Sequence, residues 1–527
     1  MNKSCNTIKR DLSVFMFFLL FSFGFLYICT ASSPRYAINP WNDANAFLTV
    51  GKSMAGGLTV YKDIFEQKGP LLYLIHALAC LICDTGFTGV YVFQSVSLCI
   101  TLFAAYKVSS LYIGVGLSVV SSVLTGIVAV DSLSYYYGDS AEEFCLPLLM
   151  ISIYFFCKYF KDTDSNRINK LTFFIVGFFA GCVAMIKFTV IGFWFAWAAY
   201  ISLYTWIAKK DFRSAALNAL VFIGGMITAI LPWIIYFGIK GALKDFIYTY
   251  FILNATAYPM NENYGLLTRL WKPLYIIGTN IITSPAIIVF SFIGMIFFLF
   301  SGIFTEKKVF SRLSVPFVCF LGIYIIYFGI RNYSYYLLPL SVFSVFSFIA
   351  LFSFIPKIIK NKKAISVFSW ILCGVVIVSS FIGSAHFNVT AQSVARCNES
   401  TFQYKAADYI QKHNPNGAIL NYNCLDCGVY LAANQIPQFR HFERQNLIYE
   451  KYSENIDEQN RYITEGLAEY VVTIAKPGEN LEDIYKSNSA LKAKYNLVFS
   501  ENYKLREQTN YKKSFTRTFY LFELKEG

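Results

Sequence analysis

The chain has 527 residues, of which 56% are hydrophobic and only 15% are charged, and its formal net charge is +13 at pH 7. Its apolar residues come in runs of about 18 to 22, the length that crosses the hydrocarbon of a bilayer. This composition excludes an ordinary soluble globular protein. The fold class that it predicts is a mainly α, polytopic membrane protein.

The excess of positive charge belongs to the hydrophobic part of the chain. Residues 385–527 contain 17 Lys and Arg against 17 Asp and Glu, so they add no net charge. A basic balance confined to the apolar region suits membrane lipids and topology better than nucleic acid. We therefore expect membrane lipids as partners and no nucleic acid.

The apolar runs predict eleven membrane spans. They cover residues 12–31, 88–107, 110–130, 143–160, 171–186, 189–207, 214–237, 284–303, 313–330, 335–355 and 364–384. The first has basic residues before it and no convincing small-residue cleavage site after it, so we expect a retained span rather than a signal peptide.

Residues 71–84 are too short for a confident span, and we expect a helix that dips into the outer leaflet. Counting them as a twelfth span would invert the topology of everything that follows. With eleven spans, one set of loops carries 18 Lys and Arg and the other set, although longer, carries ten. Positive charge marks the cytoplasmic side, so the N-terminus is predicted inside and the C-terminal region outside.

The first outer loop, 32–87, contains the stretch from Asn39 to Tyr73. Asn39 can cap a helix with Pro40 as its first residue, and Gly56-Gly57 can end it. Between them one apolar face recurs at helical spacing, with members Ala44, Phe47, Leu48, Gly51, Met54 and Ala55. This predicts an amphipathic helix at the membrane surface.

This loop resembles that of the GT-C glycosyltransferases, in particular the group of bacterial lipid A aminoarabinose transferases and protein O-mannosyltransferases. The shared pattern is an Asp that begins a surface helix, a Gly, and then G-x-x-x-Y-x-D-x-F-E-x-K-x-P-L. Here it is carried by Asp43, Gly51, Gly57, Tyr61, Asp63, Phe65, Glu66, Lys68, Pro70 and Leu71. The resemblance in architecture covers about residues 10 to 385.

The resemblance implies that Asp43 is the catalytic base. The structural alternative is a first-turn acid that stabilises the helix dipole. Lys68 lies two residues before Pro70, where members of the family use a lysine near the lipid phosphate. The structural alternative is that Lys68 lies at the membrane interface, with its ammonium extended into water. Asp63 is a further candidate acid.

The second outer loop offers more acids. Family members carry an acidic residue where this loop enters the fourth span, and Glu142 matches that place best. Glu143 and Asp139 are the alternatives, and solvation of a loop is the structural explanation for all of them.

Three residues of later spans and loops are candidates for binding the donor phosphate. Lys187 interrupts an apolar run, and an ionisable residue at membrane depth is a functional candidate. Arg331 and Tyr335 lie in Arg331-Asn-Tyr-Ser-Tyr335-Tyr336, where relatives often have His-Tyr. The chain thus lacks that imidazole, although a tyrosine hydroxyl can still donate to phosphate.

We predict no cofactor and no metal, although a divalent ion is used by some GT-C enzymes. The four histidines do not cluster, and Asp43-Ala-Asn45 is not a D-x-D pair. Cys424 and Cys427 form a lone C-x-x-C; a structural disulfide or free thiols are favoured over a redox or metal pair.

From about His386 the composition becomes polar. Short β-rich runs at Gly417–Asn421, Tyr470–Ile474 and Thr518–Leu524 alternate with helical patterns such as Phe402–Lys412. We predict a multi-span catalytic domain at 1–385 and a small extracytoplasmic α/β domain at 386–527.

The resemblance implies a glycosyltransferase that moves a sugar (hexosyl or pentosyl) from a polyprenyl-phosphate donor to a lipid, glycan or protein acceptor. We expect it in the cell membrane of a bacterium. One alternative is a transporter or flippase of lipid-linked sugars, which should show inverted repeats and charges near mid-membrane. Another is a non-catalytic, glycan-binding relative.

Overall fold

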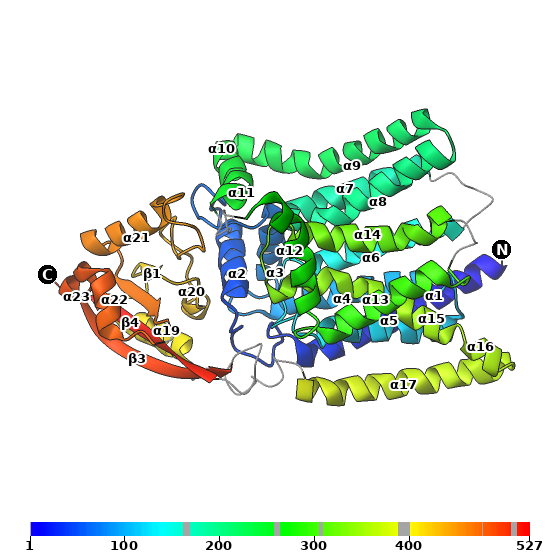
Figure 1. Cartoon of the computed structure of the whole chain (residues 1–527). Coiled ribbons are helices and arrows are strands. Elements are labelled where there is room, and N and C mark those ends of the chain that lie inside the picture. The colour runs from blue at the N-terminus through cyan, green and yellow to red at the C-terminus, as the bar shows by residue number, and fades with distance from the viewer. Residues whose placement is uncertain are drawn as a thin grey trace. The chain divides into compact units, whose positions relative to one another are not determined.

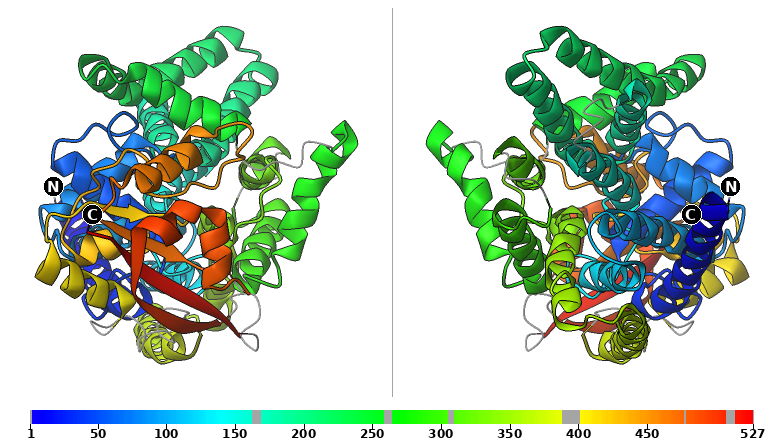
Figure 2. Two further views of the ribbon diagram at one scale, coloured as in Figure 1. Left: turned by 90° about the vertical axis from the view of Figure 1, so that its left-hand side faces the viewer. Right: turned by 90° about the vertical axis from the view of Figure 1, so that its right-hand side faces the viewer.

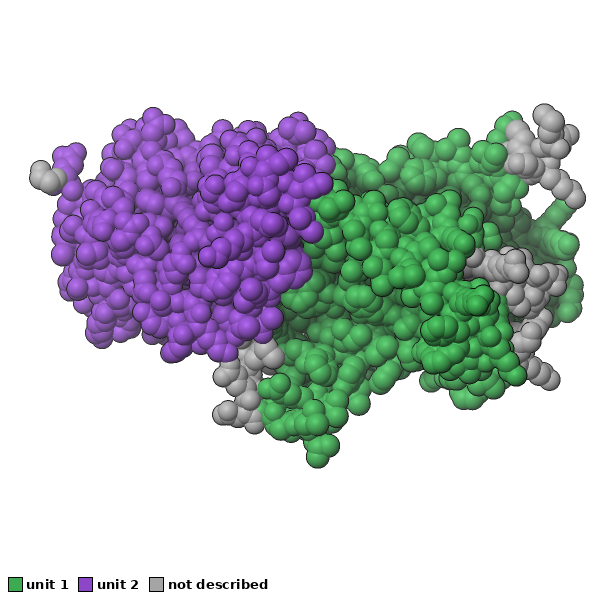
Figure 3. Space-filling view, turned by 90° about the horizontal axis from the view of Figure 1, so that it is seen from above, with its two compact units in different colours: residues 1–30, 91–233, 260–392 green, residues 31–90, 234–259, 393–527 purple. Residues whose placement is uncertain are grey.

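The computed structural model describes residues 2–161, 169–257, 264–304, 309–387, 401–476, 478–506 and 514–526. The chain forms two compact units, coloured separately in Figure 3. Unit 1 contains residues 1–30, 91–233 and 260–392, and unit 2 contains residues 31–90, 234–259 and 393–527. Unit 2 thus combines the first outer loop with the C-terminal region, and the domain boundary near residue 386 stays a prediction.

Unit 1 is helical (Figure 1). Its α-helices, two of which extend into unit 2, are α1 (Asn2–Cys29), α4 (Thr88–Ser109), α5 (Val115–Val130), α6 (Leu146–Lys161), α7 (Lys170–Lys187), α8 (Gly192–Leu203), α9 (Phe212–Ile239), α12 (Leu266–Thr279), α13 (Pro285–Phe300), α14 (Val309–Tyr327), α15 (Val345–Phe352), α16 (Ile355–Ile358) and α17 (Lys362–Phe387). Short 3-10 or π segments are η1 (Glu143–Cys145), η2 (Phe188–Ile191), η3 (Tyr204–Ala208) and η5 (Ser334–Ser344).

The eleven predicted spans all coincide with helices. Among the described residues, eight helical stretches are long and apolar enough to cross a membrane. One of them, Lys170–Ala208, is two helices, because the backbone at Lys187 is extended and the chain turns back there. Helices α7 and α8 therefore lie side by side (Figure 1). With the shorter apolar helices α5 and α13, of 16 residues each, the set is complete.

Unit 2 begins with α2 (Asn42–Ala55) and α3 (Pro70–Cys80). Helix α3 has 11 residues, so it is about 16 Å long and too short for the ~30 Å of a hydrocarbon core. It packs instead against α2. The interpretation of residues 71–84 as a short helix, rather than a twelfth span, agrees with this length.

The rest of unit 2 comprises short helices and one sheet. The helices are α10 (Leu243–Phe246), η4 (Ile247–Leu253), α11 (Asn254–Thr256), α19 (Phe402–His413), α20 (Val429–Ala432), α21 (Glu454–Glu465), α22 (Leu481–Ser487) and α23 (Ser489–Lys494). The strands are β1 (Ile419–Asn421), β2 (Tyr470–Ile474), β3 (Tyr495–Arg506) and β4 (Ser514–Leu524). They lie in the order β1-β2-β4-β3, with β1 and β2 parallel and the other neighbours antiparallel.

Alternating residues of β4 send their side chains to opposite faces of the sheet. Phe519 packs against Phe402 of α19 on one face. Phe522 joins a buried core with Ile463 of α21 and Ile484 of α22 on the other. Helices thus cover both faces, as the α/β prediction expected, and the long β3–β4 pair is clearest in Figure 2.

The contact between α2 and α3 depends on Gly51. A Cβ placed there would lie 2.4 Å from His76 Cβ and 2.8 Å from the Ala77 nitrogen. We expect Gly51→Ala to lower the free energy of unfolding by about 1–3 kcal/mol, since overpacking forces the two helices apart. Thermal unfolding of purified protein in lipid measures the effect.

Gly56→Ala is the matched control for that substitution. Gly56 has φ −75°, which alanine adopts easily, and its Cβ would meet no atom closer than 3.4 Å. Equal melting temperatures for the two variants would show that α2 and α3 are not closely packed at Gly51.

Candidate active site

The first group of candidate residues lies at the start of α2. Asp43 is in the first turn of this helix, where a carboxylate stabilises the exposed N–H groups. The predicted cap is wrong: the helix begins at Asn42, and Asn39 accepts a bond from the Trp41 N–H at 3.0 Å before it. Trp41 is extended, with φ −90° and ψ 119°, which delays the helix. The end at Gly56 agrees with the prediction.

Lys68 lies between two carboxylates of the same unit. Its Nζ is 3.9 Å from Asp43 Oδ2 and 3.6 Å from Glu66 Oε1, and it lies 5.2 Å from the centre of the Phe47 ring. The side chain of Glu66 is 3% exposed, whereas those of Asp43 and Lys68 are 20% and 18% exposed. Asp43 and Lys68 are therefore the members of this group that a ligand can reach.

The backbone around Lys68 is held by its neighbours in the pattern. The Tyr61 hydroxyl donates to the Lys68 carbonyl at 2.6 Å. The Lys68 N–H lies 2.9 Å from Glu66 Oε2 and 2.8 Å from the Tyr73 hydroxyl. Both tyrosines are buried, so their hydrogen bonds hold the Lys68 backbone in place and thereby position its side chain.

Asp63 has a different place. It is exposed, and its Oδ2 accepts a 2.7 Å hydrogen bond from the Thr59 N–H. This contact closes the turn between α2 and the Lys68 segment. Asp63 thus acts as a turn residue in the structure.

The second group of candidates lies in unit 1. Glu142, at the end of the second outer loop, forms a salt bridge with Lys187, the last residue of α7. Both side chains are buried, to 1% and 9% exposure. The extended backbone at Lys187 breaks the helix there and turns the ammonium towards the loop.

Two tyrosines cover the same ammonium. The Lys187 Nζ lies 4.7 Å from the centre of the Tyr335 ring and 4.2 Å from that of Tyr336. Tyr335 also stacks on Tyr333, with ring centres 5.4 Å apart. The aromatic faces stabilise the buried cation. Tyr336 was not among the predicted site residues, although it stands where relatives have the Tyr of His-Tyr.

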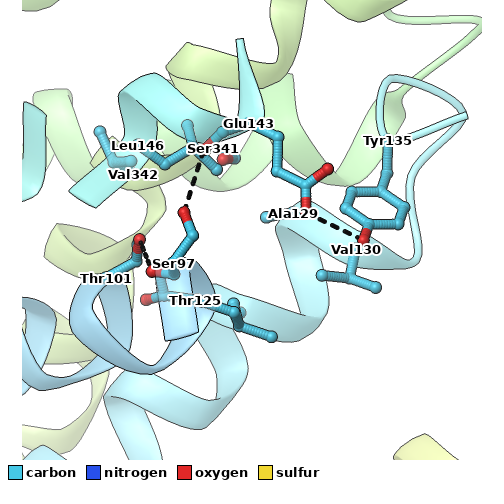
Figure 4. Close-up of a pocket in the computed structure, with 12 residues that line it drawn as sticks. Ser97, Thr101, Thr125, Ala129, Val130, Tyr135, Glu143, Leu146, Ser341 and Val342 are labelled. Atoms are coloured by element: carbon cyan, nitrogen blue, oxygen red, sulfur yellow. Dashed lines mark hydrogen bonds between the residues drawn. The ribbon is translucent and has the colours of Figure 1, made fainter. Parts of the chain in front are cut away.

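Glu143, the alternative to Glu142, faces another direction. Its carboxylate accepts bonds from Gln94 Nε2 at 2.9 Å, the Tyr135 hydroxyl at 3.0 Å and the Asp139 N–H at 2.8 Å. Figure 4 shows it beside a small enclosed cavity, into which Ser97 and Ser341 also project. Three donors on a buried carboxylate indicate a structural role that orders the loop.

The remaining candidates are near these groups in the chain. Asp139 is buried with φ +70°, an unusual backbone conformation for a residue other than glycine. Arg331 is partly buried in the segment between α14 and η5. The structure thus unites Asp43 with Lys68, and Glu142 with Lys187 and Tyr335, in one group per unit.

Each group contains the two charges that anion binding and proton transfer use. A lysine that is already paired with a carboxylate can exchange that partner for a phosphate oxygen, with a charge-assisted hydrogen bond as the result. The released carboxylate then accepts a proton from a nearby hydroxyl. Glu66, which the sequence pattern contained without a role, is the second partner of Lys68.

Within the described ranges, no three His, Cys, Asp or Glu side chains are grouped so that they could hold a metal ion. Cys424 and Cys427 are free thiols. Their sulfurs lie 3.8 Å from the Val472 carbonyl oxygen and 3.5 Å from Asn421 Oδ1, respectively. The sequence favoured either a structural disulfide or free thiols for this pair, and the structure has free thiols.

No protein-family model matches the chain, and no curated protein matches it in sequence. Solved structures do match. ArnT from Cupriavidus metallidurans bound to undecaprenyl phosphate is 10% identical, with a TM-score of 0.58 over 95% of this chain and 97% of that one. Its apo form has a TM-score of 0.59 at 9% identity, over 98% of both chains.

Two larger proteins share the fold. The oligosaccharyltransferase AglB from Archaeoglobus fulgidus, in complex with an inhibitory peptide and a dolichol-phosphate, is 11% identical, with a TM-score of 0.51 over 88% of this chain and 69% of that one. The arabinofuranosyltransferase AftD from Mycobacteria is also 11% identical, with a TM-score of 0.52 over 98% of this chain and 40% of that one. The resemblance first drawn from the outer loop is thereby confirmed for the architecture: this chain has the GT-C glycosyltransferase fold.

Proposed function

We propose that the protein is a membrane-integral glycosyltransferase that takes a sugar from a polyprenyl-phosphate donor. The observation that carries the proposal is a lysine paired with a carboxylate in each unit, Lys68 with Asp43 and Lys187 with Glu142. These are the charges that departure of a lipid phosphate and activation of an acceptor hydroxyl require. The GT-C fold supports the same reaction, since neighbours were solved with undecaprenyl phosphate and dolichol-phosphate.

The residues take the following roles in this proposal. Asp43 accepts the proton of the acceptor hydroxyl, because it is the carboxylate of its group with a ligand-accessible side chain. The candidate ligands of the donor phosphate are Lys68 in unit 2 and Lys187, Arg331 and Tyr335 in unit 1. Glu142 keeps Lys187 oriented until the donor arrives and is the second catalytic acid. The acceptor is a lipid, glycan or protein, and the sugar is a hexose or a pentose.

The flippase alternative has less support. A transporter of lipid-linked sugars needs charges near the middle of the membrane, but Lys187 is at the end of α7 and is neutralised by Glu142. Mass spectrometry of lipid-linked sugars and surface glycans, in cells with and without the protein, tests the function. If the protein is a transferase, cells without it should accumulate the lipid-linked donor, and one of their surface glycans should lack a sugar. Unchanged surface glycans would contradict the proposal.

The proposed orientation places the N-terminus in the cytoplasm of a bacterium, and the outer loops and the C-terminal region outside. It rests on the 18 basic residues of one set of loops against ten of the other. In a background without accessible native cysteines, a membrane-impermeant thiol reagent on intact cells should label Lys412→Cys and not Lys362→Cys. Both positions are exposed. The reverse labelling pattern would invert the topology.

A further inference from the structure

Asp426 is a buried carboxylate outside both groups of candidate residues. Its Oδ2 accepts a 2.6 Å hydrogen bond from the hydroxyl of Thr49, in the middle of α2. Its Oδ1 accepts bonds from the Gly428 N–H at 2.8 Å and from Asn421 Nδ2 at 3.2 Å. Asp426 has no exposed surface. These three hydrogen bonds offset the cost of burying the carboxyl group, which would be high without partners.

The segment that carries Asp426 touches α2 at further points. A Cβ on Gly428 would lie 3.0 Å from Asn45 Oδ1, so the backbone there approaches the start of the helix. Lys52, in the last turn of α2, donates to Asn434. Figure 1 shows α20, which lies between these two contacts in the chain, beside α2. Residues 426–434 thus brace the helix along its length, while α3 packs against it at Gly51.

A second buried carboxyl supports Asp426. Glu443 Oε2 accepts a 2.6 Å bond from the Asp426 N–H, and Glu443 Oε1 accepts one from Gln445 at 2.5 Å. Burial raises the pKa of Glu443 well above its usual range, and the carboxylates of Asp426, Glu66 and Asp43 raise it further. Burial raises the pKa of Asp426 as well, and the two carboxyl groups form one buried polar cluster through the Asp426 N–H.

We propose that Asp426 is a positioning residue for the transfer reaction: through Thr49 it holds α2, and with it Asp43, from the C-terminal part of the chain. This inference rests on the proposed function. A rival explanation is that Asp426 only organises its own turn, through Asn421 and Gly428. The two explanations differ at Thr49, which belongs to α2 and bonds to the Asp426 side chain, whereas the turn is closed by the bonds of Asp426 to Asn421 and Gly428.

The test is Thr49→Val in the full-length protein in lipid. Valine has nearly the shape of threonine and carries a methyl group in place of the hydroxyl that bonds to Asp426. We expect kcat for transfer to fall by about 10–100-fold, as for a small misplacement of a catalytic group, with KM for the donor unchanged. Hydrogen exchange of the α2 amides should quicken, while that of β2 stays the same. Thr49→Ser keeps the hydroxyl and should restore both readouts.

Two further variants complete the test. Ser53→Ala is the matched control, because Ser53 is buried in α2 and its hydroxyl donates to the Thr49 carbonyl within the same helix, at 2.7 Å; it should behave as wild type. Thr49→Val with Asp426→Asn should lose no more activity than Thr49→Val alone, since both disrupt the Thr49–Asp426 bond and an asparagine oxygen can still accept from Gly428 and Asn421. The proposal would be overturned if Thr49→Val and Ser53→Ala had the same kcat for transfer and the same rates of hydrogen exchange in α2.

The exchange measurement separates this inference from the proposed function. If Asp43→Asn left transfer intact, the role of Asp43 would be wrong, yet loosening of α2 in Thr49→Val would still show that Asp426 braces the helix. If Asp43→Asn were inactive and Thr49→Val normal, the function would stand and the bracing role would fail.

Discussion

Asp43→Asn is expected to reduce sugar transfer by about 10²–10⁴-fold, because the amide cannot accept the proton of the acceptor hydroxyl. Asparagine has nearly the size of aspartate and is well tolerated at a helix start. It keeps an oxygen that can face Lys68, whose Nζ is 3.9 Å from Asp43 Oδ2. The fold and the binding of the donor should therefore survive the change.

The assay is transfer from a polyprenyl-phosphate sugar by purified protein in lipid, with thermal unfolding followed in parallel. Asp63→Asn is a suitable control, because that carboxylate is exposed and accepts a bond from the Thr59 N–H, which an asparagine oxygen can also accept. Near-normal transfer by Asp43→Asn, in protein that melts like wild type, would show that Asp43 is not the catalytic base and only stabilises the helix dipole of α2.

Lys187→Met is expected to have the largest effect on stability. It removes the salt-bridge partner of Glu142, a carboxylate that is 1% exposed, and leaves that buried carboxylate without the lysine. Breaking one side of a buried pair costs about 3–5 kcal/mol. The free energy of unfolding should fall by about this amount, and transfer should be lost because the donor phosphate has lost a cation.

The double variant Lys187→Met with Glu142→Gln separates these two losses. A neutral amide beside a methionine leaves no unpaired charge, so much of the stability should return, as found when buried pairs are replaced together. Transfer should stay absent, since neither charge is restored. If the losses of unfolding free energy of the two single variants simply added in the double variant, the pairing would be contradicted. If transfer recovered together with stability, the role of the pair in transfer would be contradicted.

Glu142 and Glu143 show what a sequence cannot separate. They are neighbours in the chain and of the same residue type, and the family pattern prefers Glu142 by a single position. In the structure Glu142 contacts Lys187, 45 residues away, whereas Glu143 accepts bonds from Gln94 and Tyr135. Which acid meets the cation depends on how η1 begins, a property of the packed helices.

Local patterns determined most of the fold. The apolar runs became helices because their length and hydropathy leave few alternatives in a membrane. Strands β1, β2 and β4 were predicted from short β-rich runs, but β3 was missed. Its sequence, Tyr495–Arg506, mixes polar and charged residues, and its extended form depends on pairing with β4 at the edge of the sheet.

Patterns along the chain were thus enough to predict the eleven apolar helices and the α/β character of the C-terminal region, and they put Asp43 and Lys68 in one loop. Other contacts became visible only in the folded chain: Lys187 pairs with Glu142, Tyr336 covers the Lys187 ammonium, and Asp426 bonds to Thr49 across 377 positions. Such contacts leave no periodic signal, because each depends on packing between elements that are distant in sequence.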